Sequence, residues 1–441
     1  MSWTGAHTGP ALSDRRRTWS YVELRRDAAL WAGRLRGMGV VEGDRVAVLA
    51  RNRGEHLLVL LACEHLGATF QPMSWRLSEA ELAWQIEDSG PRVVLRDEDL
   101  DEGPGAVEVV GGPRPEREPW MLLYTSGTTG KPKGALLTHR QIRANAAVTR
   151  EVCGLSAADS TLTFTPLFHT GGLNCLTAPL LRCGGRVVLR PDLDDALEVI
   201  RSERITMLMG VPTIYQLLAD RPGFAEAMES VRDALCGGAP LSLPLLETYL
   251  AAGVPLRQGF GLTEVGPNCF SMPPSRVREK LGSVGRLVPG LEGRTVDGEL
   301  QLRGPQVFGG YLGHPPQEGW FATGDVLSCD DEGFWTVTGR RKEMFISGGE
   351  NVYPAEVEAA LYACGGVAQC AVIGVPDARW GEVGRAFVEP LPGAELSAEG
   401  LATALKERLA RFKQPKRIDV LASLPRTPTG KIDKQRLGGL S

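Results

Sequence analysis

The sequence predicts an α/β protein with a large N-terminal domain of parallel α/β layers, a β-rich subdomain, and a small α+β C-terminal domain. Three observations lead to this fold class. Helix-like and strand-like segments alternate over residues 20–100 and again over residues 185–219. Short strand patterns separated by glycines fill residues 282–325, and a helix–strand–helix pattern follows residue 340.

The first alternation comes from hydrophobic spacing and from recognisable helix ends. Apolar residues at helical spacing run up to Gly39, and an apolar-faced segment stops at Gly67. Ser78 followed by Glu81 is typical of a capping box. We therefore expect helices at 21–38, 55–66 and 78–87, and strands at 45–50, 68–73 and 91–95.

The later segments follow the same logic. We expect strands at 185–189, 206–209, 298–304 and 369–375, and helices at 195–202, 213–219, 355–362 and 398–411. The pattern changes near Lys342, so we expect domains at residues 1–341 and 342–441.

Composition excludes several classes of protein. The 441 residues carry 49 Lys and Arg against 53 Asp and Glu, a net charge of −4, so the chain is not a globally basic nucleic-acid binder. The first 17 residues lack the apolar core of a signal peptide, and the apolar run at 57–63 is too short to cross a bilayer. The nine cysteines contain no CxxC pair, so we expect neither a zinc site nor a disulfide framework, and we expect a cytoplasmic protein.

Residues 122–134, LLYTSGTTGKPKG, are the most informative segment. An apolar strand leads into ten residues with four hydroxyl side chains, three glycines and two lysines. Glycines let a backbone approach closely, and hydroxyls, N–H groups and lysines bind phosphate oxygens. A solvated turn is the alternative, but a turn needs only one or two such residues. The spacing does not meet the P-loop pattern, so the segment predicts a phosphate-binding loop of another kind.

With this loop, the chain resembles the adenylate-forming superfamily, which includes acyl-CoA synthetases and other AMP-dependent synthetases and ligases. The resemblance spans the chain from about residue 18 to the C-terminus. It rests on five motifs in the expected order: residues 122–134, QGFGLTE at 258–264, TGD at 323–325, GRRKEMFISGGENVYPAEVE at 339–358, and PRTPTGK at 425–431. It implies that the small C-terminal domain is a mobile cap.

The resemblance implies a site for ATP and Mg²⁺. It assigns Glu264 to Mg²⁺, Thr263 to the α-phosphate, and Asp325 and Arg340 to the ribose. Mg²⁺ prefers one or two carboxylates with phosphate oxygens, although Glu264 alone would read as a surface glutamate and Asp325 as a turn aspartate. The remaining nucleotide residues that it implies are Thr125, Ser126, Gly127, Thr128, Thr129, Gly130, Lys131, Lys133, Gly237, Gly238, Ala239, Gly259, Phe260 and Gly261.

The resemblance also implies residues for the acid, for coenzyme A and for movement of the cap. Lys431 would bind the attacking carboxylate, although a disordered tail lysine is the alternative. His169 would gate the acyl pocket, and Lys342 would be the hinge. The segment for coenzyme A would be Ser347, Gly348, Gly349 and Glu350, whose glycine pair also fits a tight turn before the helix at 355–362.

The function implied is an ATP-dependent acyl-CoA synthetase acting on a carboxylic acid, with a fatty acid expected. No acidic residue lies between Asp159 and Asp192, where amino-acid-activating relatives hold a substrate ammonium. An o-succinylbenzoate or aryl-acid CoA ligase, and a ligase that loads a carrier protein, stay open. A non-catalytic nucleotide-binding regulator is a further alternative function. A homodimeric state also stays open. No nucleic-acid partner and no transmembrane segment are expected.

Overall fold

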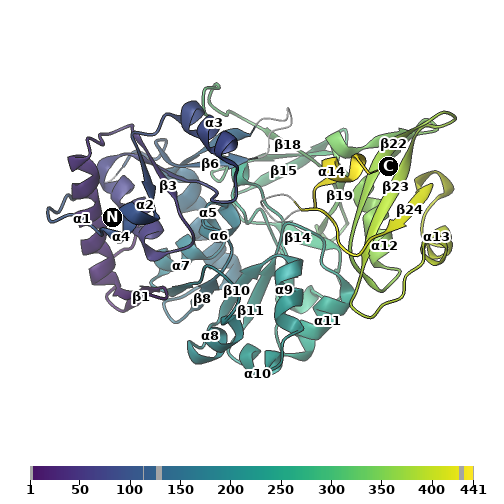
Figure 1. Cartoon of the computed structure of the whole chain (residues 1–441), viewed down its shortest axis with the longest axis horizontal. Coiled ribbons are helices and arrows are strands. Elements are labelled where there is room, and N and C mark those ends of the chain that lie inside the picture. Colours follow the sequence, from purple (N-terminus) through teal and green to yellow (C-terminus); the bar gives the residue numbers. More distant parts are fainter. Residues whose placement is uncertain (1–2, 113, 126–131, 427–431, 441) are drawn as a thin grey trace. The chain divides into compact units, whose positions relative to one another are not determined.

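The computed structural model describes residues 3–112, 114–125, 132–426 and 432–440, and its contacts divide the chain into two compact units. The first unit is Met1–Glu292 with Leu302–Phe321, and the second is Gly293–Gln301 with Ala322–Ser441 (Figure 1). Both combine helices and sheets, which confirms the predicted α/β class. The hinge at Lys342 stays a prediction.

The first unit contains a seven-stranded sheet in the order β12-β11-β10-β8-β9-β1-β2. Every pairing in it is parallel except β1 with β2. Figure 1 shows α9, α10 and α11 beside β10 and β11. The bounds are β1 Pro10–Ser13, β2 Thr18–Ser20, β8 Ser160–Thr163, β9 Arg186–Leu189, β10 Met207–Gly210, β11 Asp233–Cys236, β12 Leu256–Gln258, α6 Thr170–Asn174, α7 Thr177–Cys183, α8 Ala196–Ser202, α9 Pro212–Ala219, α10 Phe224–Met228 and α11 Leu243–Ala251.

A six-stranded sheet in the order β17-β7-β6-β4-β3-β5 completes the layers of this unit. The pairings among β3, β4, β5 and β6 are parallel, whereas β6–β7 is an antiparallel hairpin and β17 runs antiparallel to β7. The bounds are β3 Arg45–Leu49, β4 Thr69–Pro72, β5 Val93–Arg96, β6 Pro119–Thr125, β7 Lys133–Thr138, β17 Gly310–Tyr311, α1 Tyr21–Gly37, α2 Gly54–Leu66, α3 Glu79–Ser89, α4 Asp97–Asp101 and α5 His139–Cys153. Outside this sheet, β13 Phe270–Ser271 pairs antiparallel with β14 Ser283–Leu287.

Local sequence signals account for several of these boundaries. The capping box at the start of α3 is present: the Glu81 N–H donates to Ser78 Oγ, and the Ser78 N–H donates to Glu81 Oε2 at 2.8 Å. Gly67, with φ of 70°, ends α2 in the left-handed region as expected. The β6–β7 pair departs from an all-parallel layer because fewer residues separate its two strands than a parallel crossover needs.

The second unit holds a strand series ordered β19-β18-β16-β15 and a separate five-stranded sheet. In the latter, β23 pairs antiparallel with β22 and parallel with β24, and its core includes Phe345, Val357, Val372 and Leu405. The bounds are β15 Glu292–Val296, β16 Glu299–Arg303, β18 Phe321–Cys329, β19 Trp335–Arg340, β20 Phe345–Ser347, β21 Glu350–Val352, β22 Val367–Asp377, β23 Gly381–Pro390, β24 Arg417–Val420, α12 Pro354–Tyr362, α13 Ala398–Lys406 and α14 Lys434–Gly438.

The helix expected at 398–411 is too long by five residues, because α13 ends at Lys406. Its buried face consists of Leu401 and Leu405, and the Arg408 N–H bonds to the Leu405 carbonyl three residues back, so the last turn tightens and closes. Among the residues described, no helix combines the length and the apolar composition needed to cross a membrane.

A partly buried ion cluster within the second unit ties the start of α14 to two other segments. Lys434 Nζ lies 2.7 Å from Glu343 Oε2 and 2.9 Å from Glu358 Oε1, and Glu358 Oε1 also accepts the Val372 N–H. Burial is the largest single influence and raises the pKa of Glu343, but the charge of Lys434, its hydrogen bond and the nearby cationic side chains together hold this pKa below its ordinary value.

We expect Lys434→Met to lower the free energy of unfolding by about 2–4 kcal/mol, because two carboxylates lose their shared cation. Lys406→Met, at an exposed position, should change it by less than about 0.5 kcal/mol. A depressed carboxyl pKa contributes stability above the unfolded-state pKa and loses it as the pH falls, so the difference should shrink below about pH 4. Urea unfolding at several pH values measures both, and equal stability of the Lys434→Met and wild-type chains at pH 7 would contradict the account.

Candidate active site

Glu264 is the carboxylate around which the site of the first unit is built. It follows β12 on a short 3₁₀ turn, Thr263–Val265, and its side chain is only 9% exposed. The hydroxyls of Thr125 and Tyr311 both donate to Oε1, at 3.2 and 2.8 Å. A buried charge needs such donors. Three segments far apart in the sequence therefore meet at one oxygen.

The backbone that carries Glu264 is fixed on both sides. Gln141 on α5 donates from Nε2 to the Thr263 carbonyl at 3.1 Å, and the Phe308 N–H donates to the Glu264 carbonyl at 2.8 Å. Burial, and then the charge of Glu264, raise the pKa of Tyr311. Tyr311 thus keeps its proton at neutral pH and remains a donor to the carboxylate.

The base of the predicted phosphate-binding loop lies beside this carboxylate. Thr125, the last residue of β6, is the register partner of Lys133, the first residue of β7. Lys133 Nζ lies 5.3 Å from the centroid of the Tyr311 ring. One end of the loop therefore bonds to Glu264, and the other end lies near Tyr311. The predicted residues between them lie outside the described part of the chain: Ser126, Gly127, Thr128, Thr129, Gly130 and Lys131.

The two glycine-containing segments lie side by side at the carboxyl ends of β11 and β12. The Gly259 N–H donates to the Cys236 carbonyl at 2.8 Å, and a Cβ placed on Gly237 would lie 3.8 Å from the Gly259 carbonyl oxygen. Adjacent parallel strands bring their following loops together, and such crevices bind ligands in α/β sheets. The predicted residues that meet here are Gly237, Gly238, Ala239, Gly259, Phe260 and Gly261.

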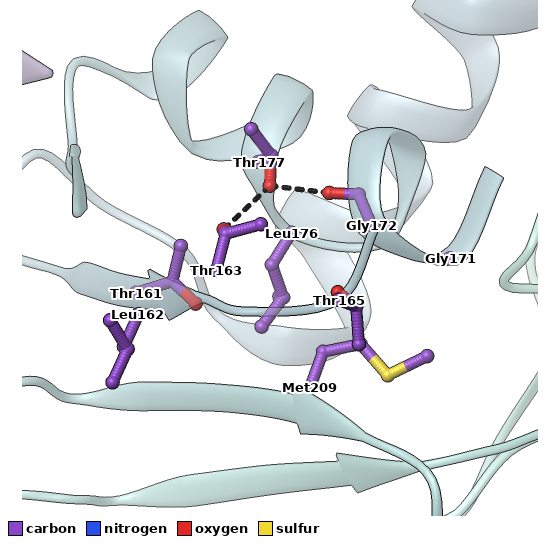
Figure 2. A pocket seen from close by; sticks show the side chains of 9 residues that line it. All are labelled: Thr161, Leu162, Thr163, Thr165, Gly171, Gly172, Leu176, Thr177 and Met209. Carbon is purple, nitrogen blue, oxygen red and sulfur yellow. Dashed lines mark hydrogen bonds between the residues drawn. The ribbon is translucent and has the colours of Figure 1, made fainter. Parts of the chain in front are cut away.

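His169 precedes α6, and its segment borders a small pocket. The His169 ring is half-buried, 5.0 Å from the ring of Phe168. Figure 2 shows the pocket between β8, β10 and the two helices α6 and α7, with Met209 and Thr165 among its walls. A Cβ on Gly171 would lie 3.5 Å from Met209 Cε, and one on Gly237 would lie 3.8 Å from the same atom. Met209 is thus the common neighbour of two segments that the sequence singled out.

Asp325 and Arg340 belong to the second unit and are paired there. They are register partners on β18 and β19, and Arg340 Nε lies 2.8 Å from Asp325 Oδ1. The Asp325 side chain is buried, at 2% exposure, and Thr323 Oγ1 accepts its backbone N–H. The structure therefore brings together the two residues that the sequence assigned to one ribose.

The expected coenzyme A segment is a β-hairpin turn. Gly348 and Gly349, with φ of 60° and 89°, connect β20 to β21, and Ser347 pairs with Glu350 across the turn. Positive φ at both central residues favours glycine, so the tight-turn alternative for this pair is confirmed. Lys342 is exposed on a 3₁₀ turn, Arg341–Glu343, and Lys431 lies outside the described residues.

Sequence reasoning missed three residues that the structure places at the site: Gln141, Tyr311 and Met209. Gln141 lies on α5, a helix that the pattern analysis did not predict. Tyr311 follows two glycines in the run GGYLG, which indicates close backbone packing but no partner. Within the described residues, no group of three or more His, Cys, Asp and Glu side chains is placed to hold a metal ion.

Comparison with known proteins identifies the family. The model described as AMP-binding enzyme matches residues 3–115 and 98–312, and the model for the AMP-binding enzyme C-terminal domain matches residues 356–431. The chain belongs to the AMP-binding enzyme family. The predicted superfamily is thereby confirmed.

Relatives of this AMP-binding enzyme cover nearly its whole length. A feruloyl-CoA synthase from Amycolatopsis sp is 39% identical over 97% of this chain and 94% of its own. An indoleacetate–CoA ligase from Aromatoleum aromaticum is 37% identical over 98% of this chain and 96% of its own. The solved o-succinylbenzoate CoA synthetase from Bacillus subtilis, in complex with ATP and magnesium ion, is 31% identical, with a TM-score of 0.88 and 99% of both chains covered.

Gly261 and Gly259 offer a matched pair for testing the packing of this loop. A Cβ on Gly261 would lie 2.0 Å from the Pro267 carbonyl oxygen, whereas one on Gly259 would lie 3.8 Å from its nearest neighbour. We expect Gly261→Ala to cost about 1–3 kcal/mol in unfolding free energy, because backbone must move. Gly259→Ala should cost less than about 1 kcal/mol. Urea unfolding compares them, and an unchanged midpoint for Gly261→Ala would show that the loop does not pack this way.

Proposed function

We infer that this chain is an ATP-dependent ligase that joins a carboxylic acid to the thiol of coenzyme A. The acid's carboxylate oxygen attacks the α-phosphorus of ATP, and the bond to the β,γ-diphosphate breaks, giving an acyl-adenylate and pyrophosphate. The thiol of coenzyme A then loses its proton and attacks the acyl carbon. The bond to the adenylate oxygen breaks, which releases AMP and the thioester.

This proposal rests on one observation: Glu264 is buried at the base of the 125–133 loop and bonded there to Thr125 and Tyr311. A buried carboxylate beside a segment rich in hydroxyls, glycines and lysines suits a nucleotide whose phosphates approach together with a cation. The relatives support the same chemistry, since their names specify CoA synthases and ligases, and a related synthetase has been solved with ATP and magnesium.

The donor set at Glu264 fits Mg²⁺. This cation is commonly bound by one or two carboxylates plus substrate phosphates. Both hydrogen bonds that the described residues make to the Glu264 carboxylate go to Oε1, and we assign Oε2 to the cation. Bound Mg²⁺ would offset the negative charge that builds on phosphorus oxygens. The chain's own part is to orient the carboxylate through Thr125 and Tyr311.

We propose the following roles for the remaining residues of the first unit. The 125–133 loop and Thr263 bind the phosphates, and the loops after β11 and β12 border the adenine and the acid. His169 stands at the acid's entry. The residues assigned to the nucleotide are Thr125, Ser126, Gly127, Thr128, Thr129, Gly130, Lys131, Lys133, Gly237, Gly238, Ala239, Gly259, Phe260 and Gly261.

In the second unit, we propose that Asp325 binds the ribose hydroxyls and that its pairing with Arg340 holds its carboxylate in place. We assign the acid's carboxylate and the α-phosphate to Lys431, and the hinge to Lys342, which divides residues 1–341 from the cap at 342–441. The pantetheine arm of coenzyme A would pass Ser347, Gly348, Gly349 and Glu350, where a Cβ placed on Gly349 would meet nothing within 4 Å.

We favour an aryl acid over the fatty acid that the sequence predicted. Ferulate, indoleacetate and o-succinylbenzoate, which the names of the three relatives specify, each combine an aromatic ring with a carboxyl group. The relatives with aromatic substrates cover almost the whole chain, whereas the fatty-acid expectation rested on short motif similarities.

We place the enzyme in the cytoplasm, because its nine cysteines are all free thiols and a reducing compartment keeps them so. We also propose that the protein forms a homodimer. The molar mass of the purified protein, measured by light scattering, checks this.

The test is exchange of labelled pyrophosphate into ATP with a panel of ferulate, indoleacetate, o-succinylbenzoate and long-chain fatty acids. We expect exchange with at least one aryl acid, and AMP release when coenzyme A is added. Glu264→Ala should lower the exchange rate about 10²–10³-fold. Exchange without consumption of coenzyme A would favour carrier-protein loading, and no exchange with any acid would favour a non-catalytic regulator.

Lys431→Ala should abolish pyrophosphate exchange and spare thioester formation from a supplied acyl-adenylate, because its ammonium is assigned to the first step alone. Stopped assays of the two half-reactions measure this separation, with Arg436→Ala, whose side chain is 74% exposed on α14, as a matched control. Equal loss in both half-reactions would remove the proposed division of labour.

A further inference from the structure

One face of α5 carries three buried polar side chains to which the proposed function gives no role. Gln141, Asn145 and Thr149 follow one another at intervals of four residues, so they lie on the same side of the helix, and none is more than 2% exposed. Burying an amide or a hydroxyl costs free energy unless it is hydrogen-bonded. The partners of these side chains therefore indicate what this face of α5 holds in place.

Two of the three side chains bond to the segment that carries the buried carboxylate, residues 263–268. Gln141 Nε2 donates to the Thr263 carbonyl at 3.1 Å, directly before the carboxylate residue. Farther along the helix, Thr149 Oγ1 accepts a hydrogen bond from Asn268 Nδ2 at 2.8 Å. Both ends of segment 263–268 are therefore fixed to the same face of α5.

Asn145, between those two positions, holds the end of α6. Its Nδ2 donates to the Asn174 carbonyl at 2.7 Å, and Asn174 Nδ2 donates in turn to Thr170 Oγ1 at 3.3 Å, beside His169. On the other side of the amide, a Cβ placed on Gly266 would lie 2.9 Å from Asn145 Oδ1, so segment 263–268 packs closely against it. Asn145 therefore stands between this segment and the helix that His169 precedes.

Asn268 completes the connection between the segment and the two helices. Besides its bond to Thr149, its Nδ2 donates to the Cys175 carbonyl at 3.2 Å, directly after α6. Figure 1 shows α5 next to α6, and the two helices are in contact. Segment 263–268, α5 and α6 are thus joined to one another by side-chain hydrogen bonds in every pairing except the close packing at Gly266.

We propose that this face of α5 positions Glu264 relative to His169, so that the cation and the acid meet at one fixed separation. The proposal rests on the function proposed above and deepens it. Gln141, Asn145 and Thr149 act through segment 263–268 and through α6, so they are positioning residues, not catalytic ones. Polar side chains suit this role because buried hydrogen bonds specify one arrangement, whereas apolar side chains could repack.

Gln141→Met keeps the length of the side chain and removes the donor to the Thr263 carbonyl. In the nucleotide-free protein, deuterium should enter the backbone amides of segment 263–268 about tenfold faster. The Mg²⁺ concentration that half-saturates pyrophosphate exchange should rise about tenfold, the usual scale for residues that orient a metal ligand. Thioester formation from a supplied acyl-adenylate should stay within about twofold, because the cation is assigned to the first half-reaction.

Asn145→Leu has nearly the same volume and removes the donor to the Asn174 carbonyl. Deuterium should enter the amides of residues 170–174 about tenfold faster. The KM for the acid should rise about tenfold, because a small displacement of the segment beside His169 misplaces the acid, while the KM for ATP stays within about twofold.

Tyr249→Phe is the matched control, because it also removes a buried donor to a backbone carbonyl. The Tyr249 hydroxyl, on α11, donates to the Tyr215 carbonyl at 3.0 Å. This variant should lower the urea midpoint as Gln141→Met does, and yet leave the deuterium uptake of segment 263–268, the Mg²⁺ dependence and the KM for the acid within about twofold of wild type.

The outcomes separate this inference from the proposed function. If Gln141→Met and Asn145→Leu fold but leave the Mg²⁺ dependence and the KM for the acid within twofold, the positioning role is overturned, even if deuterium uptake rises, and the proposed function stands. If the wild-type protein exchanges pyrophosphate with no acid, the proposed function fails, and unchanged deuterium uptake in both variants would overturn the positioning role by itself. Thr149→Val, of the same shape, should change the Mg²⁺ dependence about three- to fivefold and keeps the test decisive if Gln141→Met does not fold.

Discussion

A buried carboxylate organises the site of the first unit. Taking an ionised group out of water costs several kcal/mol unless donors replace the lost hydration, and Glu264 has its donors in Thr125 and Tyr311. These residues come from the end of β6, the turn after β12 and the short strand β17. Satisfying one charge therefore fixes the relative position of three segments, among them the strand that leads into the phosphate-binding loop.

Sheet topology supplies the rest of the arrangement. Because β8, β10, β11 and β12 are parallel, the segments that follow them emerge at one edge of the sheet, which is where α/β proteins bind ligands. Two glycine-containing loops meet there, and Met209 fills part of the space beside them. In the proposed function, the nucleotide and the acid share this edge of the sheet.

The sequence predicted whatever depends on local pattern. The helix at 21–38 and the capping box at Ser78 follow from spacing and from side chains three residues apart, and the structure confirms both. The loop at 122–134 was recognisable because its composition is unusual. Pairings across long separations were not: Tyr311 meets Glu264 only because β17 adds to β7, a contact that no spacing encodes. The end of α13 at Lys406 was missed because the hydrogen bond from the Arg408 N–H to the Leu405 carbonyl, which residue spacing does not reveal, tightens the last turn.

The central claim is that Glu264 and the 125–133 loop hold the metal-bound phosphates of ATP. A crystal structure of the protein grown with ATP and Mg²⁺ in the absence of acid measures this most directly. We expect a metal about 2.0–2.1 Å from a Glu264 oxygen, with the hydrogen bond from Tyr311 retained on the other oxygen. A nucleotide bound elsewhere, with Glu264 contacting only Thr125 and Tyr311, would contradict the account.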